Sequence, residues 1–347
     1  MNHREKLESI YLPIFSELGI TSFSLALYRS GYENLSFGIG SIEQGNHSVP
    51  LSVDHNTLFQ LASVSKFFTS CLLLELARQK LLDINQPILS HTLPKCFASR
   101  SEIFDEHQIT WGHLLTHRAG FNDQGGVVGQ NLYGYCLSEV QGWKRNIADY
   151  YDSNLFGIFH YSACGYWLIQ QLLESTFSRS FASLLTQFIL KPLGMNGTCS
   201  GSLDSHFSNY ATGVDLSGIL TSSYMHYPGC EAVAGIWSSA NDLGLLFQHL
   251  LRSFPDTKRS NGKSLPLITL RDLINSPFNG SYQYGLAIAK KYDQNCWIHT
   301  GLNPGYTSAV MLNPDANAGL AFLINSGISS GALQSLLDIG YLLMRRL

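Results

Sequence analysis

A serine and a lysine three residues apart, Ser63 and Lys66, are the residues whose types and spacing most directly suggest chemistry. On a helix, residues three apart share one face, so the hydroxyl and the amine can touch. A serine hydroxyl is a poor nucleophile until a neighbouring group takes its proton. A lysine can be that group if a desolvated, positively charged site depresses its pKa. The pair therefore predicts a serine nucleophile that is activated by an amine.

The S-x-x-K pattern is a weak signal by itself, because Ser260 and Lys263 repeat it in a stretch typical of a surface loop. For a bare match, a solvated helix face is the more common explanation. The surroundings of Ser63 differ, since residues 57–62 and the apolar run after Phe67 indicate that this serine opens a buried helix. The start of a helix offers free N–H groups and a positive dipole to an anion. It can supply half of an oxyanion hole.

Further segments accompany this pair in a fixed order along the chain. They are Ile109–Gly120, Tyr161–Ala163, Lys191–Met195, Ala234–Leu243 and His299–Gly301. Together with Ser63 to Lys66, they make the chain resemble the class C serine β-lactamases, the penicillin-binding D-peptidases and the esterases of the same fold. The resemblance covers most of the chain. It implies acyl transfer through a covalent intermediate on Ser63, and we expect no cofactor and no metal ion.

The resemblance also implies roles for individual residues. Tyr161 takes the position of the family's catalytic tyrosine, which with Lys66 relays the proton from nucleophile to leaving group. Because a tyrosine titrates near about 10, it acts as a base only where cations such as Lys66 stabilise its phenolate. The alternative for Tyr161 is a core tyrosine with one satisfied hydroxyl. The backbone N–H groups of Ser63 and Leu302 are expected to form the oxyanion hole.

Two departures from the family pattern bear on the substrate. His299, Thr300 and Gly301 stand where the family carries K-T-G, and histidine is only partly charged near neutrality, whereas lysine is a permanent cation for a carboxylate. Ala163 stands where β-lactamases and peptidases usually carry the asparagine that holds the substrate amide. Gly301 is expected to let substrate approach the strand closely. With these four as substrate-binding residues, the sequence predicts esterase-like cleavage of small esters or amides.

Other functions stay open at this point. The same pattern fits a β-lactamase or a D-amino-acid peptidase or carboxypeptidase, and a non-catalytic penicillin-binding-like sensor is a further alternative. The G-x-S-x-G match at Gly327–Gly331 fails as a nucleophile elbow, because no histidine follows Ser329. His113 and His117 have the spacing of a helical metal pair, but Leu114 replaces the glutamate of H-E-x-x-H. Packing or capping roles are favoured for both histidines.

The elements that must position these residues change in type along the chain. Apolar residues at helical spacing over Leu58–Lys80 predict a long buried helix that starts near Ser63, and further helices are expected over Trp167–Phe177, Phe181–Leu190, Ala240–Arg252 and Ala332–Arg346. Strands are expected at Ser22–Tyr28, Leu35–Ile39, Tyr284–Ala289, Cys296–His299, Ser308–Leu312 and Gly319–Ile324. This order predicts an α+β fold of the β-lactamase/transpeptidase type. Residues 1–86 and 266–347 would form an α/β sandwich lobe, an antiparallel sheet with flanking helices. Residues 87–265 would form an inserted, mostly helical lobe, with the active site in the cleft between the lobes.

The composition of the chain excludes several classes of protein and partner. Of 347 residues, 45% are hydrophobic and 14% charged, which favours a large core over disorder. A net charge of −3 without a basic stripe argues against nucleic acid as a partner. The seven cysteines lack any C-x-x-C pair and are typical of free thiols in a reducing compartment. Residues 1–20 read as an amphipathic helix, and no apolar run is long enough to span a bilayer. We expect a cytoplasmic protein that acts on a small ester, amide or peptide.

Overall fold

The computed structural model describes most of the chain. It covers residues 3–20, 22–32, 34–42, 50–93, 101–122, 147–201, 203, 207–215, 229–252, 267–291 and 294–346. The second S-x-x-K match, at Ser260 to Lys263, lies outside the described residues, as do Cys96 and Cys136.

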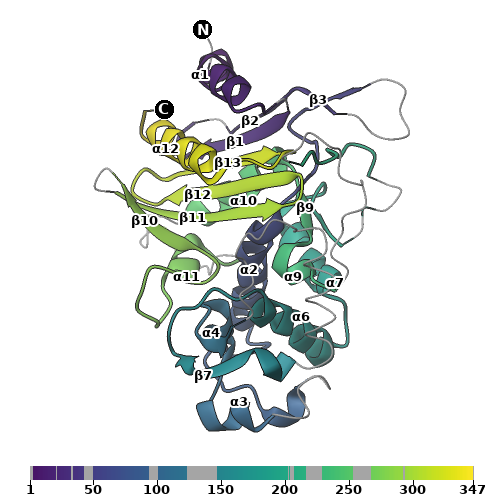
Figure 1. Cartoon of the computed structure of the whole chain (residues 1–347), viewed down its shortest axis with the longest axis vertical. Helices are drawn as coiled ribbons and strands as arrows, with labels where there is room; N and C mark the ends of the chain where they lie inside the picture. Colours follow the sequence, from purple (N-terminus) through teal and green to yellow (C-terminus); the bar gives the residue numbers. More distant parts are fainter. Residues whose placement is uncertain are drawn as a thin grey trace.

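A six-stranded antiparallel sheet in the order β10-β11-β12-β13-β1-β2 forms the centre of the fold (Figure 1). Its strands are β1 Phe23–Arg29, β2 Leu35–Ile39, β10 Ala287–Lys291, β11 Gln294–Asn303, β12 Tyr306–Asn313 and β13 Ala318–Ile324. In the middle of the sheet, Leu25 of β1 lies opposite Phe322 of β13. Strands from both ends of the sequence therefore pair directly, which confirms the predicted fold class.

Helices cover both faces of this sheet (Figure 1). Because side chains alternate along a strand, Leu25 and Leu27 pack with helices α1 (His3–Glu17) and α12 (Ser330–Arg346), whereas Ala26 faces the larger core. On that second face, helix α10 (Ala240–Leu251) contacts β1 and β13. Helix α10 thus covers the sheet although it belongs to the segment expected to be the helical lobe. The lobe boundaries at residues 86 and 265 stay a prediction.

Helix α2 (Ser65–Arg78) joins the sheet to the helical region, which lies at its far end in Figure 1. Twelve of its residues, from Ser65 to Leu76, are buried, because α7, α9 and α11 all pack on it. The other helices of the described chain are α3 Glu102–His107, α4 Trp111–Leu115, α6 Ala163–Phe177, α7 Phe181–Leu185, α8 Lys191–Leu193, α9 Glu231–Ala234 and α11 Leu270–Ile274.

Short elements complete the description. The 3₁₀ turns are η1 Ala62–Val64, η2 Ser90–Thr92 and η4 Ile147–Tyr150, and η5, Thr186–Leu190, is a π-helix. The short strands are β3 Ser41–Ile42, β4 Leu51–Ser52, β5 Phe59–Gln60, β6 Ala119–Phe121, β7 Tyr151–Phe156, β8 Cys199–Ser200 and β9 Ile236–Ser238. Strand β9 pairs with both β5 and β8.

Two elements differ from the sequence expectation for local reasons. The strand expected from Tyr284 begins at Ala287, because Gly285 has φ +73° and turns the chain onto α2. A Cβ at Gly285 would lie 2.5 Å from the Ser70 hydroxyl and 3.0 Å from the Lys66 carbonyl oxygen. The helix expected near Ser63 begins with the η1 turn, and α2 follows at Ser65.

Two described cysteines, Cys71 and Cys296, are buried free thiols. Burial raises the pKa of both, that of Cys296 to about 12, so neither thiolate forms readily near neutrality. In the ranges described above, no helix combines the length and apolar character that crossing a bilayer requires.

Candidate active site

The hydroxyl of Ser63 and the amine of Lys66 are in contact at the start of α2. The Lys66 Nζ donates a hydrogen bond to Ser63 Oγ at 3.2 Å and another to the carbonyl oxygen of Val233 at 3.0 Å. Lys66 is 1% exposed, whereas Ser63 is partly exposed. The arrangement places a buried lysine in contact with a partly exposed serine.

The turn that carries Ser63 is strained and tightly held. Ala62, the residue before it, is buried and has φ +47°, a left-handed conformation that costs an L-residue about 1 kcal/mol or more. Both backbone polar groups of Leu61 are hydrogen-bonded. Its N–H donates to the carbonyl oxygen of Ile236, and its own carbonyl oxygen accepts from the Ser308 hydroxyl at 2.6 Å. Such strain persists where the surrounding structure imposes it.

Gly301 on β11 packs against this same turn. A Cβ at Gly301 would lie 2.2 Å from the Leu61 carbonyl oxygen, 2.4 Å from the Ser308 hydroxyl and 3.1 Å from the Ala62 Cβ. Gly301 therefore permits a close approach of β11 to protein, and the expected approach of substrate to Gly301 stays a prediction. This glycine lets β11 lie directly on the nucleophile turn.

The end of β11 that carries Gly301 extends past its neighbour. In the described part of the chain, β10 pairs with β11 only as far as Ile298, whereas β12 pairs as far as Asn303. Thr300 and Leu302 are partly exposed along this stretch. Asn303 anchors its end, because its amide donates to the Gln60 side chain at 2.8 Å and to the Ala234 carbonyl at 3.3 Å.

His299 is a buried, uncharged member of the site. It is 6% exposed, and its Nδ1–H donates to the Thr300 carbonyl at 2.9 Å, so Nε2 carries the lone pair. Burial first, and the charge of Lys66 second, lower the pKa of His299 to about 3. The sequence suggested partial charge at neutrality, but the surroundings make this side chain a neutral hydrogen-bond acceptor.

Tyr161 lies beside the lysine, on the loop before α6. Its ring centre is 5.1 Å from Lys66 Nζ, which is cation–π distance, and the ring is partly exposed. The next residue, Ser162, caps α6 by accepting a hydrogen bond from the Gly165 N–H at 3.2 Å. Ala163 is the first residue of α6 and is partly buried. Its methyl group gives the site no amide where the family pattern has one.

His117, which the sequence did not mark as a site residue, lies against Tyr161 and two further tyrosines. The His117 ring is 4.4 Å from the Tyr161 ring, 5.0 Å from the Tyr166 ring and 4.8 Å from the Tyr282 ring. His117 Nδ1 accepts from the Ser162 N–H at 3.1 Å. Burial first, and the charge of Lys66 second, hold the pKa of His117 well below its usual range. His117 and His299 are therefore both neutral around Lys66.

The remaining motifs have structural roles. His113 and Thr110 form a capping box at the start of α4, which is one of the roles favoured for His113. Ser329 caps α12, since its hydroxyl accepts from the Ala332 N–H at 3.1 Å. Within the described ranges, no group of three His, Cys, Asp or Glu side chains is arranged to hold a metal ion.

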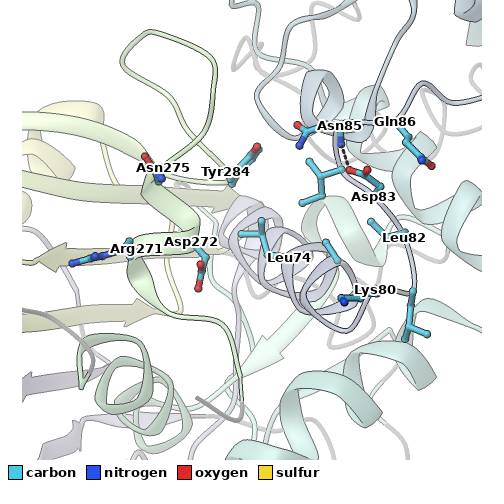
Figure 2. A pocket seen from close by; sticks show the side chains of 13 residues that line it. Leu74, Lys80, Leu82, Asp83, Asn85, Gln86, Arg271, Asp272, Asn275 and Tyr284 are labelled. Atoms are coloured by element: carbon cyan, nitrogen blue, oxygen red, sulfur yellow. Dashed lines mark hydrogen bonds between the residues drawn. The ribbon is translucent and has the colours of Figure 1, made fainter. Parts of the chain in front are cut away.

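A separate cavity of about 740 Å³ lies toward the other end of α2 (Figure 2). Leu74 and Lys80, with the residues that follow α2, line one side, and Asp272 and Tyr284 line the other. The lining does not include Ser63, Lys66 or Tyr161. The candidate site and this cavity are therefore distinct places on the same helix.

Comparison with known sequences gives the family. The beta-lactamase family model matches residues 13–337. The chain is 28% identical over 342 residues to Beta-lactamase-like protein 4 of Dictyostelium discoideum, covering 90% of this chain and 58% of that protein. It is 27% identical over 220 residues to a beta-lactamase of Pseudomonas fluorescens, covering 62% of this chain and 56% of that protein. The chain thus spans less than two thirds of the length of either relative.

Solved structures show the same fold at low identity. A penicillin-binding protein homologue from Pyrococcus abyssi aligns at a TM-score of 0.70 and 22% identity, covering 98% of this chain and 78% of that one. A class C beta-lactamase aligns at a TM-score of 0.72 and 16% identity, covering 96% of this chain and 93% of that one. A D-amino acid amidase from Ochrobactrum anthropi aligns at a TM-score of 0.69 and 20% identity, covering 94% of this chain and 92% of that one. With a family match over nearly its whole length and this shared fold, the chain belongs to the beta-lactamase family.

Proposed function

We propose that this protein is a serine hydrolase that works through an acyl-enzyme on Ser63. The observation that carries the proposal is the 3.2 Å contact between Lys66 Nζ and Ser63 Oγ, in which the lysine is buried and the serine is partly exposed. A hydroxyl becomes a useful nucleophile when a group within hydrogen-bond reach takes its proton. The beta-lactamase family consists largely of serine hydrolases, which agrees with this chemistry.

In the acylation step, Ser63 Oγ forms a bond to the substrate carbonyl carbon while its proton passes to the Lys66 amine, which must be in its neutral form to accept it. The carbonyl electron pair moves onto oxygen, where the backbone N–H groups of Ser63 and Leu302 would stabilise the negative charge. When the carbonyl re-forms, the bond to the alcohol or amine leaving group breaks. Lys66 and Tyr161 return the proton to that leaving group.

In the deacylation step, a water molecule attacks the acyl carbon and gives up a proton to the same two side chains. The acyl–oxygen bond breaks, the acid product leaves, and the proton returns to Ser63 Oγ. The Val233 carbonyl supports both steps, because it binds one N–H of Lys66 and so limits the directions that the amine can take.

The substrate class follows from two side chains that lack the expected groups. His299 is neutral and can only accept a hydrogen bond at Nε2, so it offers no cation to a substrate carboxylate. Ala163 has no amide with which to read a substrate amide. We therefore propose small, uncharged esters, and amides second, as substrates. The β-lactamase, D-peptidase and non-catalytic readings remain as alternatives with different experimental outcomes.

The test is intact-mass spectrometry across a panel of short-chain aryl esters, D-amino-acid peptides and a chromogenic cephalosporin. An acyl adduct that forms in a burst and then turns over on the esters supports the proposal. Turnover of the cephalosporin or the peptides in preference would replace it by one of those activities. An adduct that never turns over, or none at all, would support the non-catalytic reading.

Variants assign the adduct to a residue. Ser63→Ala should abolish the adduct, and Lys66→Ala should lower turnover by at least about 10³-fold, since both remove a group in contact with the reaction. Ser260→Ala is the matched control for the second S-x-x-K match and should behave as wild type. Full activity in Ser63→Ala would refute the assignment.

A further inference from the structure

We infer that Gln170 is a positioning residue, which holds helix α9 in place so that the Val233 carbonyl keeps the Lys66 amine on Ser63. The inference rests on the proposed function, because it concerns the same amine. Gln170 lies on α6 and is 2% exposed, and among the described residues its hydrogen bonds go to residues other than Ser63 and Lys66. It therefore acts through α9.

Helix α9 cannot hold its own position. It has four residues, Glu231–Ala234, which is far below the length at which a helix is stable by itself. Its N-cap residue, Cys230, makes no side-chain capping hydrogen bond. The position of the Val233 carbonyl must therefore be set by whatever surrounds α9.

Gln170 binds α9 through both ends of its side-chain amide. Its carbonyl oxygen accepts a hydrogen bond from the Ala232 N–H at 3.0 Å, and its Nε2 donates to the carboxylate of Glu231. The other oxygen of Glu231 accepts from the Gly229 N–H at 3.1 Å. One buried amide thus fixes the backbone of α9 and the side chain that closes the preceding turn.

On its other side, α9 is bound to α2. The Thr69 hydroxyl donates to the Ala232 carbonyl at 2.7 Å, and the Ser65 hydroxyl accepts from the N–H of Ile236, which begins β9 just after α9, at 3.1 Å. These bonds remain when Gln170 is replaced. Loss of Gln170 should therefore shift or loosen α9 without detaching it.

A shift of α9 would affect the Lys66 amine through the carbonyl oxygen of Val233. A carbonyl oxygen only accepts hydrogen bonds, so the 3.0 Å contact commits one N–H of Lys66 to Val233. The amine is tetrahedral, and fixing one of its directions restricts where the others point, Ser63 included. A misplacement of about 1 Å in such a group can lower a rate on the order of 100-fold.

The chain offers a matched control beside Gln170. Gln171 is the same residue type on the same helix, and it is partly exposed. The test compares Gln170→Leu with Gln171→Leu in the full chain. Two readouts are needed: the rate of Ser63 acylation by an aryl ester across pH, and the ¹³C chemical shifts of Lys66 in protein labelled with ¹³C-lysine, assigned by loss of the signal in Lys66→Arg.

The expected result is that Gln170→Leu lowers kcat about 10- to 100-fold with KM within about twofold, changes the shape of the pH profile and moves the Lys66 signal. Gln171→Leu should match wild type in all three. If Gln170→Leu does not fold, Gln170→Glu replaces it. That variant keeps the acceptor for Ala232, loses the donor to Glu231 and should move the Lys66 signal in the same sense.

An unmoved Lys66 signal with an unchanged pH profile would overturn the inference, whatever the rate. The NMR readout does not need turnover, so the two proposals can fail separately. If wild type is never acylated but Gln170→Leu still moves the Lys66 signal, the proposed function fails and the positioning role stands.

Discussion

Replacing Gly301 by alanine tests whether β11 must lie directly on the nucleophile turn. The new methyl group would lie 2.2 Å from the Leu61 carbonyl oxygen and 2.4 Å from the Ser308 hydroxyl. Real Cβ atoms essentially never approach a neighbour closer than 3.0 Å, so strand and turn must separate by about 1 Å. The Leu61 carbonyl belongs to backbone already held by Ile236 and Ser308, so it cannot simply rotate away.

The magnitude follows from this forced movement. Overpacking of a well-ordered core costs about 1–3 kcal/mol of unfolding free energy. Because the moved turn carries Ser63, the same displacement of about 1 Å should lower the acylation rate on the order of 100-fold. Urea denaturation and single-turnover acylation by an aryl ester measure the two effects.

Gly244 provides the matched control. It lies inside α10, where an added Cβ would meet no atom within 4 Å. Gly244→Ala should therefore raise the free energy of unfolding by about 0.5–1 kcal/mol, as alanine does in helix interiors, and leave acylation unchanged. If Gly301→Ala kept wild-type stability and acylated within threefold of the wild-type rate, the reasoning about this contact would be refuted.

Three further predictions concern charge. Both His117 and His299 have lowered pKa values in the folded state, that of His299 about 3, whereas an unfolded histidine titrates near about 6.5. Because the unfolded state then binds more protons below that pH, the free energy of unfolding should be greatest above about pH 7 and fall toward pH 4. Urea unfolding against pH should show this slope reduced in His299→Gln, and an unchanged slope would contradict it. His299→Lys should improve kcat/KM about tenfold for an ester whose acyl group carries a carboxylate, relative to its uncharged analogue, because it supplies a cation; no relative gain would count against this site. Glu75 is buried and accepts from Arg78 and the Ile268 N–H, so Glu75→Leu should cost about 3 kcal/mol, and a loss under about 1 kcal/mol by calorimetry would disprove that role.

Much of the fold could be predicted because its signals are local. In strands such as β2 and β13, apolar residues either alternate with polar ones or follow one another directly, and turn residues bound the stretch. The bounds of these strands match the expectation within a residue or two. The proximity of Ser63 and Lys66 could also be predicted, since helical spacing alone brings them together. The class of sheet and its construction from both ends of the sequence followed from the order of these elements.

What escaped prediction depends on surroundings rather than on residue type. The Val233 carbonyl is a backbone atom, so no residue type announces its contact with Lys66. The neutrality of His299 arises from burial, and the role of Gly301 from a turn 240 residues away in the sequence. His117 was within a segment that carried the family resemblance, but its contact with Tyr161 is visible only in three dimensions.

The order of the strands has a consequence for how the protein is made. Strand β1 pairs on one side with β2, a few residues later, and on the other with β13, which the ribosome completes roughly 290 residues later. At about 5–20 residues per second, a hairpin of β1 and β2 formed during synthesis would wait roughly 15–60 s with one edge of β1 unpaired. Translation speed and chaperone supply should therefore influence the yield of this protein.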